Sequence, residues 1–182
     1  MNRNSMKFLT WIKQIFSNQP ENQLGSKRRE ESVLDLTFDQ TDIDYFKNLC
    51  EFIWIQGEPI PLIYDLSNRV YSNQAITLPM IERLAVIGLI YYAPEGFVKK
   101  KLGKHTRFFY HGRLTKIGFA QDDNNQLDLG TVLLTEVGKK LYATVSPTPN
   151  QQFYEYVIQY WFQQGLLLSS PLGSPQRPHL VK

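Results

Sequence analysis

The sequence predicts an α+β fold, and three observations lead to this prediction. Apolar residues recur at helical spacing between residues 41 and 88, whereas short β-branched and aromatic runs separated by turns fill residues 89–134. Helical spacing returns between residues 135 and 165. Hydrophobic residues make up 42% of the 182 positions and aromatic residues 13%, which is enough to bury a core and is not typical of a disordered chain.

The composition also bears on the compartment. Cys50 is the single cysteine, so the chain has neither an intramolecular disulfide nor a zinc cluster of thiolates. No apolar run reaches the roughly 18 to 20 residues that span a bilayer, and no small-residue cleavage site follows the short apolar run near the N-terminus. We therefore expect a protein of the reduced cytoplasm.

The chain divides into four parts. Residues 1–16 form an amphipathic helix, residues 17–40 a polar flexible linker, residues 41–168 the folded domain, and residues 169–182 a disordered tail that contains three prolines. The apolar face of the N-terminal helix consists of Phe8, Leu9, Trp11, Ile12, Ile15 and Phe16.

Three helices open the domain. Thr41 is the expected N-cap of the first, whose apolar face continues to about Gly57. Prolines then interrupt the pattern before a shorter helix over residues 62–71. The third begins at Thr77 and ends at Gly88, which suits the position after a helix because glycine tolerates positive φ.

Strands follow, and two helices close the domain. The expected strands cover residues 89–92, 97–101, 105–110, 113–119 and 131–134; His111-Gly112 forms a tight hairpin turn, and residues 121–128 form a surface loop. Thr135 caps a helix that runs to Tyr142, and Asn150 caps a final helix that ends at Gly165. The stripe on this last helix is interpreted as core or homodimer interface; it includes Phe153, Val157, Tyr160 and Trp161.

Two short motifs flank the strand region. Residues 84–90 read Leu-Ala-Val-Ile-Gly-Leu-Ile, and residues 134–141 read Leu-Thr-Glu-Val-Gly-Lys-Lys-Leu. Three helices followed by these motifs resemble the pattern of winged helix-turn-helix proteins over roughly residues 41–145. The resemblance implies a winged-helix domain whose wing touches the DNA backbone. About 40 residues separate Leu89 from Thr131, so we expect an enlarged wing or a second hairpin.

A narrower resemblance rests on three segments. Residues 46–50 (Phe-Lys-Asn-Leu-Cys), 108–113 (Phe-Phe-Tyr-His-Gly-Arg) and 133–139 (Leu-Leu-Thr-Glu-Val-Gly-Lys) are similar to the C-terminal half of an uncharacterised bacterial family, a domain of unknown function. This resemblance implies a bacterial origin and a fold rather than an activity.

Positive charge is concentrated in one stretch. Residues 97–119 carry seven basic and no acidic residues, whereas residues 41–96 carry three basic and seven acidic ones. The seven cations are Lys99, Lys100, Lys101, Lys104, Arg107, Arg113 and Lys116. Together with the neighbouring aromatic residues they predict one electropositive surface that contacts nucleic-acid phosphate without sequence preference. The alternative is a solvated hairpin whose charges protect an edge strand or meet the chain's own acidic segment.

The third helix is poor in residues that read base edges. Arg83 is its one arginine, and Met80, Glu82 and Val86 lie around it. A helix of this kind fits phosphate contact or protein binding better than sequence-specific recognition. A protein-interaction adaptor in a larger bacterial complex, docked through this domain and residues 1–16, is therefore the second hypothesis.

Residues 6–16 leave three alternatives open. Their apolar face can cover the domain itself, enter a groove on a partner protein, or insert into a membrane surface. Catalysis has little support, since His105, His111 and His179 do not lie at metal-ligand spacing and no phosphate-loop or calcium-loop motif is complete. We therefore expect a non-catalytic protein without cofactor or metal, with a buried structural thiol at Cys50.

Overall fold

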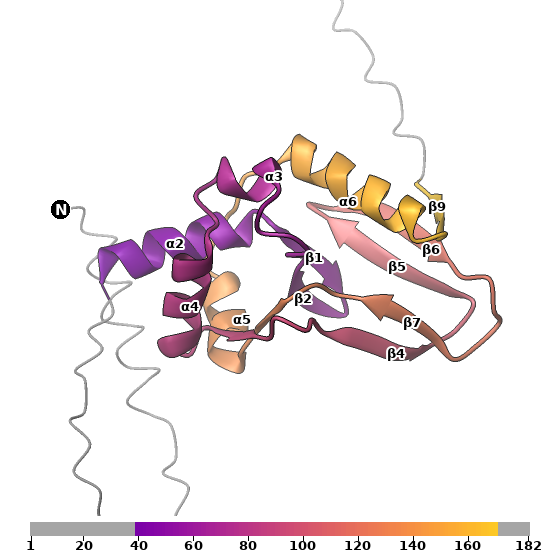
Figure 1. Cartoon of the computed structure of the whole chain (residues 1–182), viewed down its shortest axis with the longest axis horizontal. Helices are drawn as coiled ribbons and strands as arrows, with labels where there is room; N and C mark the ends of the chain where they lie inside the picture. Colours follow the sequence, from indigo (N-terminus) through magenta and orange to yellow (C-terminus); the bar gives the residue numbers. More distant parts are fainter. Residues whose placement is uncertain (1–38, 171–182) are drawn as a thin grey trace, which may run out of the picture.

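The computed structural model describes residues 39–170, and these residues form a mixed α+β fold (Figure 1). The elements in chain order are α2 (Gln40–Cys50), β1 (Ile53–Gln56), β2 (Glu58–Pro61), α3 (Arg69–Ser72), α4 (Leu78–Val86), β3 (Ile90–Tyr92), β4 (Val98–Leu102), β5 (His105–Tyr110), β6 (Arg113–Gly118), β7 (Asn125–Asp128), β8 (Val132–Leu134), α5 (Glu136–Tyr142), α6 (Gln151–Gln163) and β9 (Leu167–Ser169). The α+β class is thus confirmed.

Three antiparallel sheets organise the strands. The largest has five strands in the order β2-β1-β5-β6-β9, and two-stranded sheets pair β3 with β8 and β4 with β7. The hairpin of β5 and β6 turns at His111 and Gly112, whose φ angles of 46° and 79° suit a two-residue hairpin turn that follows the twist of the strands. This turn fixes the register that places Arg107 opposite Lys116.

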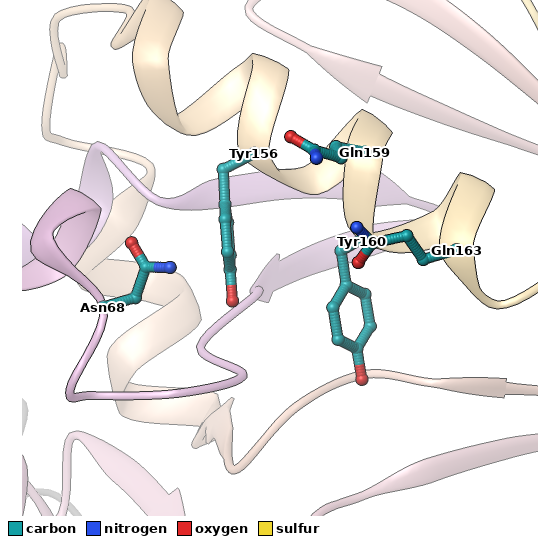
Figure 2. A pocket seen from close by; sticks show the side chains of 5 residues that line it. All are labelled: Asn68, Tyr156, Gln159, Tyr160 and Gln163. Carbon is teal, nitrogen blue, oxygen red and sulfur yellow. The ribbon is translucent and has the colours of Figure 1, made fainter.

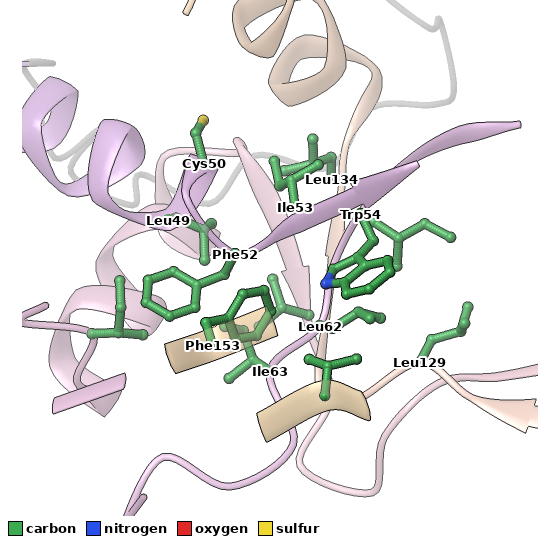
Figure 3. Packing of buried hydrophobic residues seen from close by; sticks show 14 of the residues in the cluster. Leu49, Cys50, Phe52, Ile53, Trp54, Leu62, Ile63, Leu129, Leu134 and Phe153 are labelled. Carbon is green, nitrogen blue, oxygen red and sulfur yellow. The ribbon is translucent and has the colours of Figure 1, made fainter. Parts of the chain in front are cut away.

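Aromatic side chains hold α6 against the five-stranded sheet. Trp54 of β1 stacks on Tyr154 at a centroid distance of 5.4 Å and meets Trp161 edge-on at 5.0 Å. The Trp54 indole lies in the buried cluster that also contains Phe52 and Phe153 (Figure 3). Tyr110 of β5 stacks on the same indole at 5.1 Å. Its hydroxyl donates to the carbonyl of Glu51 and accepts from the backbone N–H of Asn150, both at 2.8 Å, so it joins the end of α2 to the start of α6.

The first helix is shorter than the sequence predicts. It begins at Gln40, with Asp39 rather than Thr41 as N-cap, and ends at Cys50 instead of near Gly57. Residues 53–56 form β1 and residues 58–61 form β2. The reason is burial, because Phe52, Ile53 and Trp54 are all at most 2% exposed, and β1 lies between two other strands. Ile53 and Trp54 point to opposite faces of β1 and are both buried, so the segment lacks the alternation that marks a half-buried strand.

The predicted helix over residues 62–71 is also wrong. Leu62 and Ile63 are fully buried in an extended segment, and the helix α3 covers only Arg69–Ser72 after the N-cap Asn68. Ile63 is held by a parallel bridge to Gly130, where an added Cβ would lie 2.4 Å from the Ile63 carbonyl oxygen. This close backbone approach needs an extended chain at Ile63 and a glycine opposite.

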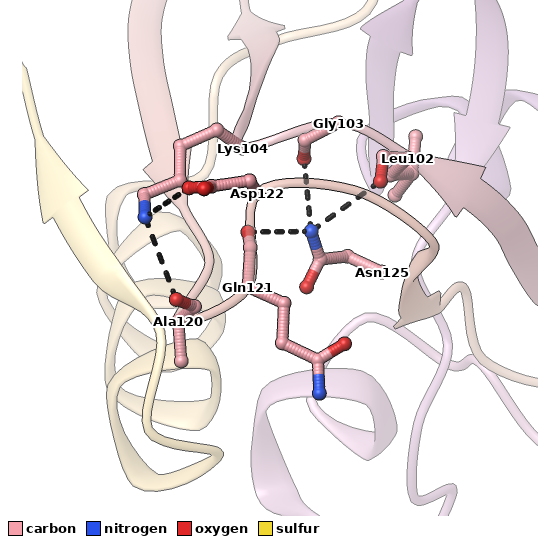
Figure 4. Close-up of polar contacts among 7 residues, drawn as sticks. All are labelled: Leu102, Gly103, Lys104, Ala120, Gln121, Asp122 and Asn125. Carbon is pink, nitrogen blue, oxygen red and sulfur yellow. Dashed lines mark hydrogen bonds and ion pairs between the residues drawn. The ribbon is translucent and has the colours of Figure 1, made fainter.

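Residues 121–128 are not all loop. Asn125–Asp128 form β7, which pairs with β4 and buries Leu127. Asn125 anchors the turn before it, because its side-chain amide nitrogen lies 2.9–3.3 Å from the carbonyl oxygens of Leu102, Gly103 and Gln121 (Figure 4). A second departure is β9, a short edge strand in the apolar run after α6.

Candidate functional site

The two flanking motifs meet in one junction. The hydroxyl of Thr135, the N-cap of α5, donates to the Gly88 carbonyl at 2.7 Å and accepts from the N–H of Gly138 at 3.0 Å. Leu89 completes the junction, since its carbonyl oxygen accepts the Thr135 N–H at 3.1 Å and would lie 2.1 Å from a Cβ on Gly138. The motif residues thus join α4, β3, β8 and α5.

Arg83 of α4 is bound to its own domain. Its Nε and one terminal nitrogen each donate to the Asp42 carboxylate at 2.7 Å, and Asp42 is 1% exposed. Burial alone would raise the pKa of Asp42, but the hydrogen bonds from Arg83 and from the Asp39 backbone outweigh burial and lower the pKa. The arginine that a recognition helix would use for bases therefore stabilises the start of α2 instead.

The seven predicted cations do not form one surface. Lys99 donates a hydrogen bond to Gln56, which in turn donates one to Thr106. Gln56 and Thr106 lie on the same face of the large sheet as the buried side chains of Trp54 and Phe108. The guanidinium carbon of Arg113 lies 3.8 Å above the Tyr154 ring, on the side of the sheet that carries α6. Three further cations lie outside the large sheet or at its end.

Lys104, Lys100 and Lys101 are these three. The Lys104 ammonium lies 2.7 Å from the carboxylate of Asp122, so its charge is neutralised within the chain (Figure 4). Lys100 and Lys101 are exposed on β4 at an irregularity in its pairing with β7, and Lys101 has a φ of 60°. The expectation of one continuous electropositive surface is therefore wrong.

Arg107 and Lys116 remain together on the large sheet. They are directly opposite each other on β5 and β6, so their side chains lie on the same face. Along β5, exposed residues 105, 107 and 109 alternate with buried residues 106, 108 and 110, which face α6. Arg107 and Lys116 thus share the uncovered face, and within residues 39–170 no carboxylate lies within 4.0 Å of either.

Aromatic and apolar groups flank this cation pair. Phe109 is 39% exposed and lies opposite Leu114 on the same face. On the other side, His105 lies opposite Gly118, and its ring atoms Nδ1 and Cε1 are 3.3 and 3.5 Å from the position of a Cβ on that glycine. We call the surface formed by His105, Arg107, Phe109, Leu114 and Lys116 the open face.

A pocket of about 210 Å³ lies elsewhere, on the outer side of α6 (Figure 2). Its lining has no residue charged at neutral pH and consists of Asn68, Tyr156, Gln159, Tyr160 and Gln163. The Tyr160 hydroxyl donates to Asp128 at 2.7 Å, and burial, followed by this bond, raises the pKa of Tyr160. A pocket without cations offers no counter-charge to phosphate.

Most of the α6 stripe is core. Phe153, Val157 and Trp161 are at most 1% exposed, whereas Tyr160 is half-buried and stacks on Tyr64 at 3.9 Å. The core alternative of the sequence interpretation therefore holds for three of the four residues. Sequence reasoning missed Tyr64, whose hydroxyl accepts the Trp161 indole N–H at 3.0 Å, because its partner lies 97 positions away.

Cys50 and His111 are affected by burial. The Cys50 side chain is fully buried and its pKa is raised, as expected for a structural thiol. Partial burial lowers the pKa of His111. Cys50 lacks the exposed, electropositive surroundings that activate a nucleophile.

Within residues 39–170 there is no group of three or more metal-ligating side chains, and no helix there has the length and hydrophobicity to cross a bilayer. The predicted contact residues Phe8, Leu9, Trp11, Ile12, Ile15 and Phe16 lie outside the described residues, as does most of the tail from residue 169. Comparisons with family models, curated proteins and solved structures gave no match.

Proposed function

We propose that this chain is a non-catalytic binding module of the bacterial cytoplasm that holds nucleic-acid phosphate on its open face. The observation that carries the proposal is the cation pair Arg107–Lys116. Like charges directly opposite each other on a sheet repel and lower stability. An external anion that binds between two such cations removes their repulsion and so stabilises the folded chain. Nucleic acid is a common polyanion in a bacterial cell.

The proposal includes a winged-helix interpretation of the fold. In it, α2, α3 and α4 are the three helices, β3 and β8 form the base of the wing, and the strands between them form the enlarged wing. Support comes from the antiparallel pairing of Ile90 with Leu134 and from the junction at Thr135. The open face then belongs to the wing, where the resemblance implies contact with the nucleic-acid backbone.

Fluorescence anisotropy with a labelled oligonucleotide tests the proposal. Binding is measured between 25 and 200 mM salt for the full chain and for R107E/K116E. Two phosphate contacts predict a slope of log K against log salt of about −1.4 on a single strand, whereas seven would give about −5. We expect the shallow slope and a loss of at least about tenfold in affinity for R107E/K116E.

The matched control is K100E/K101E, which changes net charge by the same amount on exposed side chains of β4. It should bind within about threefold of the unmodified chain, because its lysines lie on β4 and not on β5 or β6, which carry the cation pair. Equal loss in both variants would mean that overall charge governs binding, and no binding at 25 mM salt would end the proposal.

A second candidate function, a protein-interaction adaptor, has one observation in its favour. Leu78 and Val86 on α4 are 42% and 61% exposed, and Tyr91 on the following strand is 58% exposed. Apolar groups on the helix that would read DNA fit a protein partner better. Affinity capture with the full chain after nuclease treatment tests it, since V86D should lose a stoichiometric partner that R107E/K116E retains.

A further inference from the structure

We propose that the ligand of the open face is a single strand whose unpaired bases stack on Phe109 and His105, on either side of a phosphate held by Arg107 and Lys116. This inference rests on the proposed function and adds the class of nucleic acid to it. Its basis is the order of groups along β5, where an aromatic ring, a cation pair and an imidazole follow one another on one face.

The spacing along the strand suits an extended chain. Successive residues on one face of an antiparallel strand are about 6.8 Å apart, so Phe109 and His105 lie about 14 Å apart with Arg107 midway. Bases in a duplex stack about 3.4 Å apart and cover one another's faces. Only an unstacked strand can therefore present one base to each ring with phosphate between them.

The two rings offer surfaces for stacking. Phe109 is 39% exposed although Ile55 of β1 and Leu114 of β6 flank it as cross-strand partners. His105 lies against the backbone at Gly118, where a larger residue would push the imidazole away from the sheet. Glycine at this position therefore keeps the imidazole low on the sheet and leaves its outer side accessible to a base.

A duplex would use less of this surface. Its bases are paired and stacked, so a flat sheet face reaches mainly its phosphates. The cation pair alone would then act, and the rings would contribute little. Stacking of bases on aromatic side chains adds affinity without sequence preference, which agrees with a face that lacks asparagine and glutamine side chains.

The test compares three probes and three variants of the full chain. The probes are a 12-nucleotide thymidine oligomer, the same backbone with abasic sites throughout, and a duplex of equal length. The variants are F109L, F109Y and R107E/K116E. F109L keeps an apolar side chain of similar volume and removes the ring, whereas F109Y keeps the ring.

We expect F109L to weaken binding of the thymidine oligomer about fivefold or more, F109Y to restore it, and neither to change binding of the abasic strand. The unmodified chain should prefer the thymidine oligomer to the abasic strand and the duplex. Equal binding of all three probes, or an unchanged affinity in F109L, would overturn the inference while the loss in R107E/K116E upholds the proposed function. An unchanged affinity in R107E/K116E would instead overturn the proposed function.

Discussion

Gly138 gives the sharpest test of how the junction between the two motifs is built. Replacing it by alanine adds one methyl group inside α5. In an unconstrained helix this change is favourable by about 1 kcal/mol, because glycine is the poorer helix former. Here the added Cβ would lie 2.1 Å from the Leu89 carbonyl oxygen, where ordinary contact needs at least 3.4 Å.

The added methyl group would belong to α5, and the atom that it meets belongs to the backbone at Leu89, so a side-chain rotation cannot relieve the clash. Moving α5 away would stretch the hydrogen bonds from Thr135 to the carbonyls of Gly88 and Leu89, which measure 2.7 and 3.1 Å. Two lost bonds cost about 2 kcal/mol, and overpacking costs about 1–3 kcal/mol more. After subtracting the gain in propensity, we expect a net destabilisation of about 2–4 kcal/mol.

Urea unfolding followed by tryptophan fluorescence measures this effect, because Trp54 and Trp161 are both buried. G103A is the matched control, since a Cβ on Gly103 meets only the Asp122 carbonyl oxygen at 3.9 Å. It should change the free energy of unfolding by less than about 1 kcal/mol. If G138A is as stable as the unmodified chain, the packing argument is refuted.

Three further predictions concern single groups. D42N should lower the free energy of unfolding by about 2 kcal/mol, because it removes the carboxylate that binds Arg83, although Arg83 keeps partial access to water. The pKa of Asp42 is lower in the folded chain than in the unfolded chain, so its stabilising effect is present at neutral pH and is lost as the pH falls. Urea titrations should therefore show the difference at neutral pH and a smaller one below about pH 4. N150A should cost about 1 kcal/mol by removing the bond from the Phe153 N–H, measured by thermal unfolding, and no change would contradict the cap. The Cys50 thiol, buried and with a raised pKa, should react with a disulfide reagent at pH 8 only after denaturant is added, and rapid native labelling would contradict its burial.

The elements that the sequence predicts well carry local signals. Thr135 and Asn150 cap their helices, Gly88 and Gly165 end theirs with positive φ, and the β5–β6 hairpin turns where expected. Each of these signals lies within a few residues of the structure that it specifies. Local sequence was therefore sufficient for them.

Other elements depend on distant partners. Strand β1 shows no clear alternation because Ile53 and Trp54, which point to opposite faces, are both buried, and its apolar run is therefore similar to that of an amphipathic helix. Strand β7 lies in a polar run without a strand pattern. Its pairing with β4 includes a register shift between Lys99 and Leu102, for which the sequence has no local signal. Secondary structure of this kind follows from the sheet as a whole and not from the segment.

The candidate site shows the same division. A two-residue turn at His111 and Gly112 is sufficient to place Arg107 opposite Lys116 and Phe109 opposite Leu114. Which face remains uncovered depends on where α6 packs, about 40 residues later in the chain. The sequence therefore identified the cations, whereas the packing of α6 determines that Arg107 and Lys116 lie on the uncovered face and Arg113 on the covered one.

The hydroxyl of Tyr110 ties the tip of the β5–β6 hairpin to both the first and the last helix. Separation of the hairpin tip from the rest of the domain would therefore break the hydrogen bonds of Tyr110 to the end of α2 and to the start of α6. Opening of the hairpin is thus coupled to loss of helical structure that is remote in sequence. Amide hydrogens of β5 and of the first turn of α6 should accordingly exchange with solvent as one cooperative unit, and a ligand that settles on the hairpin would slow exchange in both.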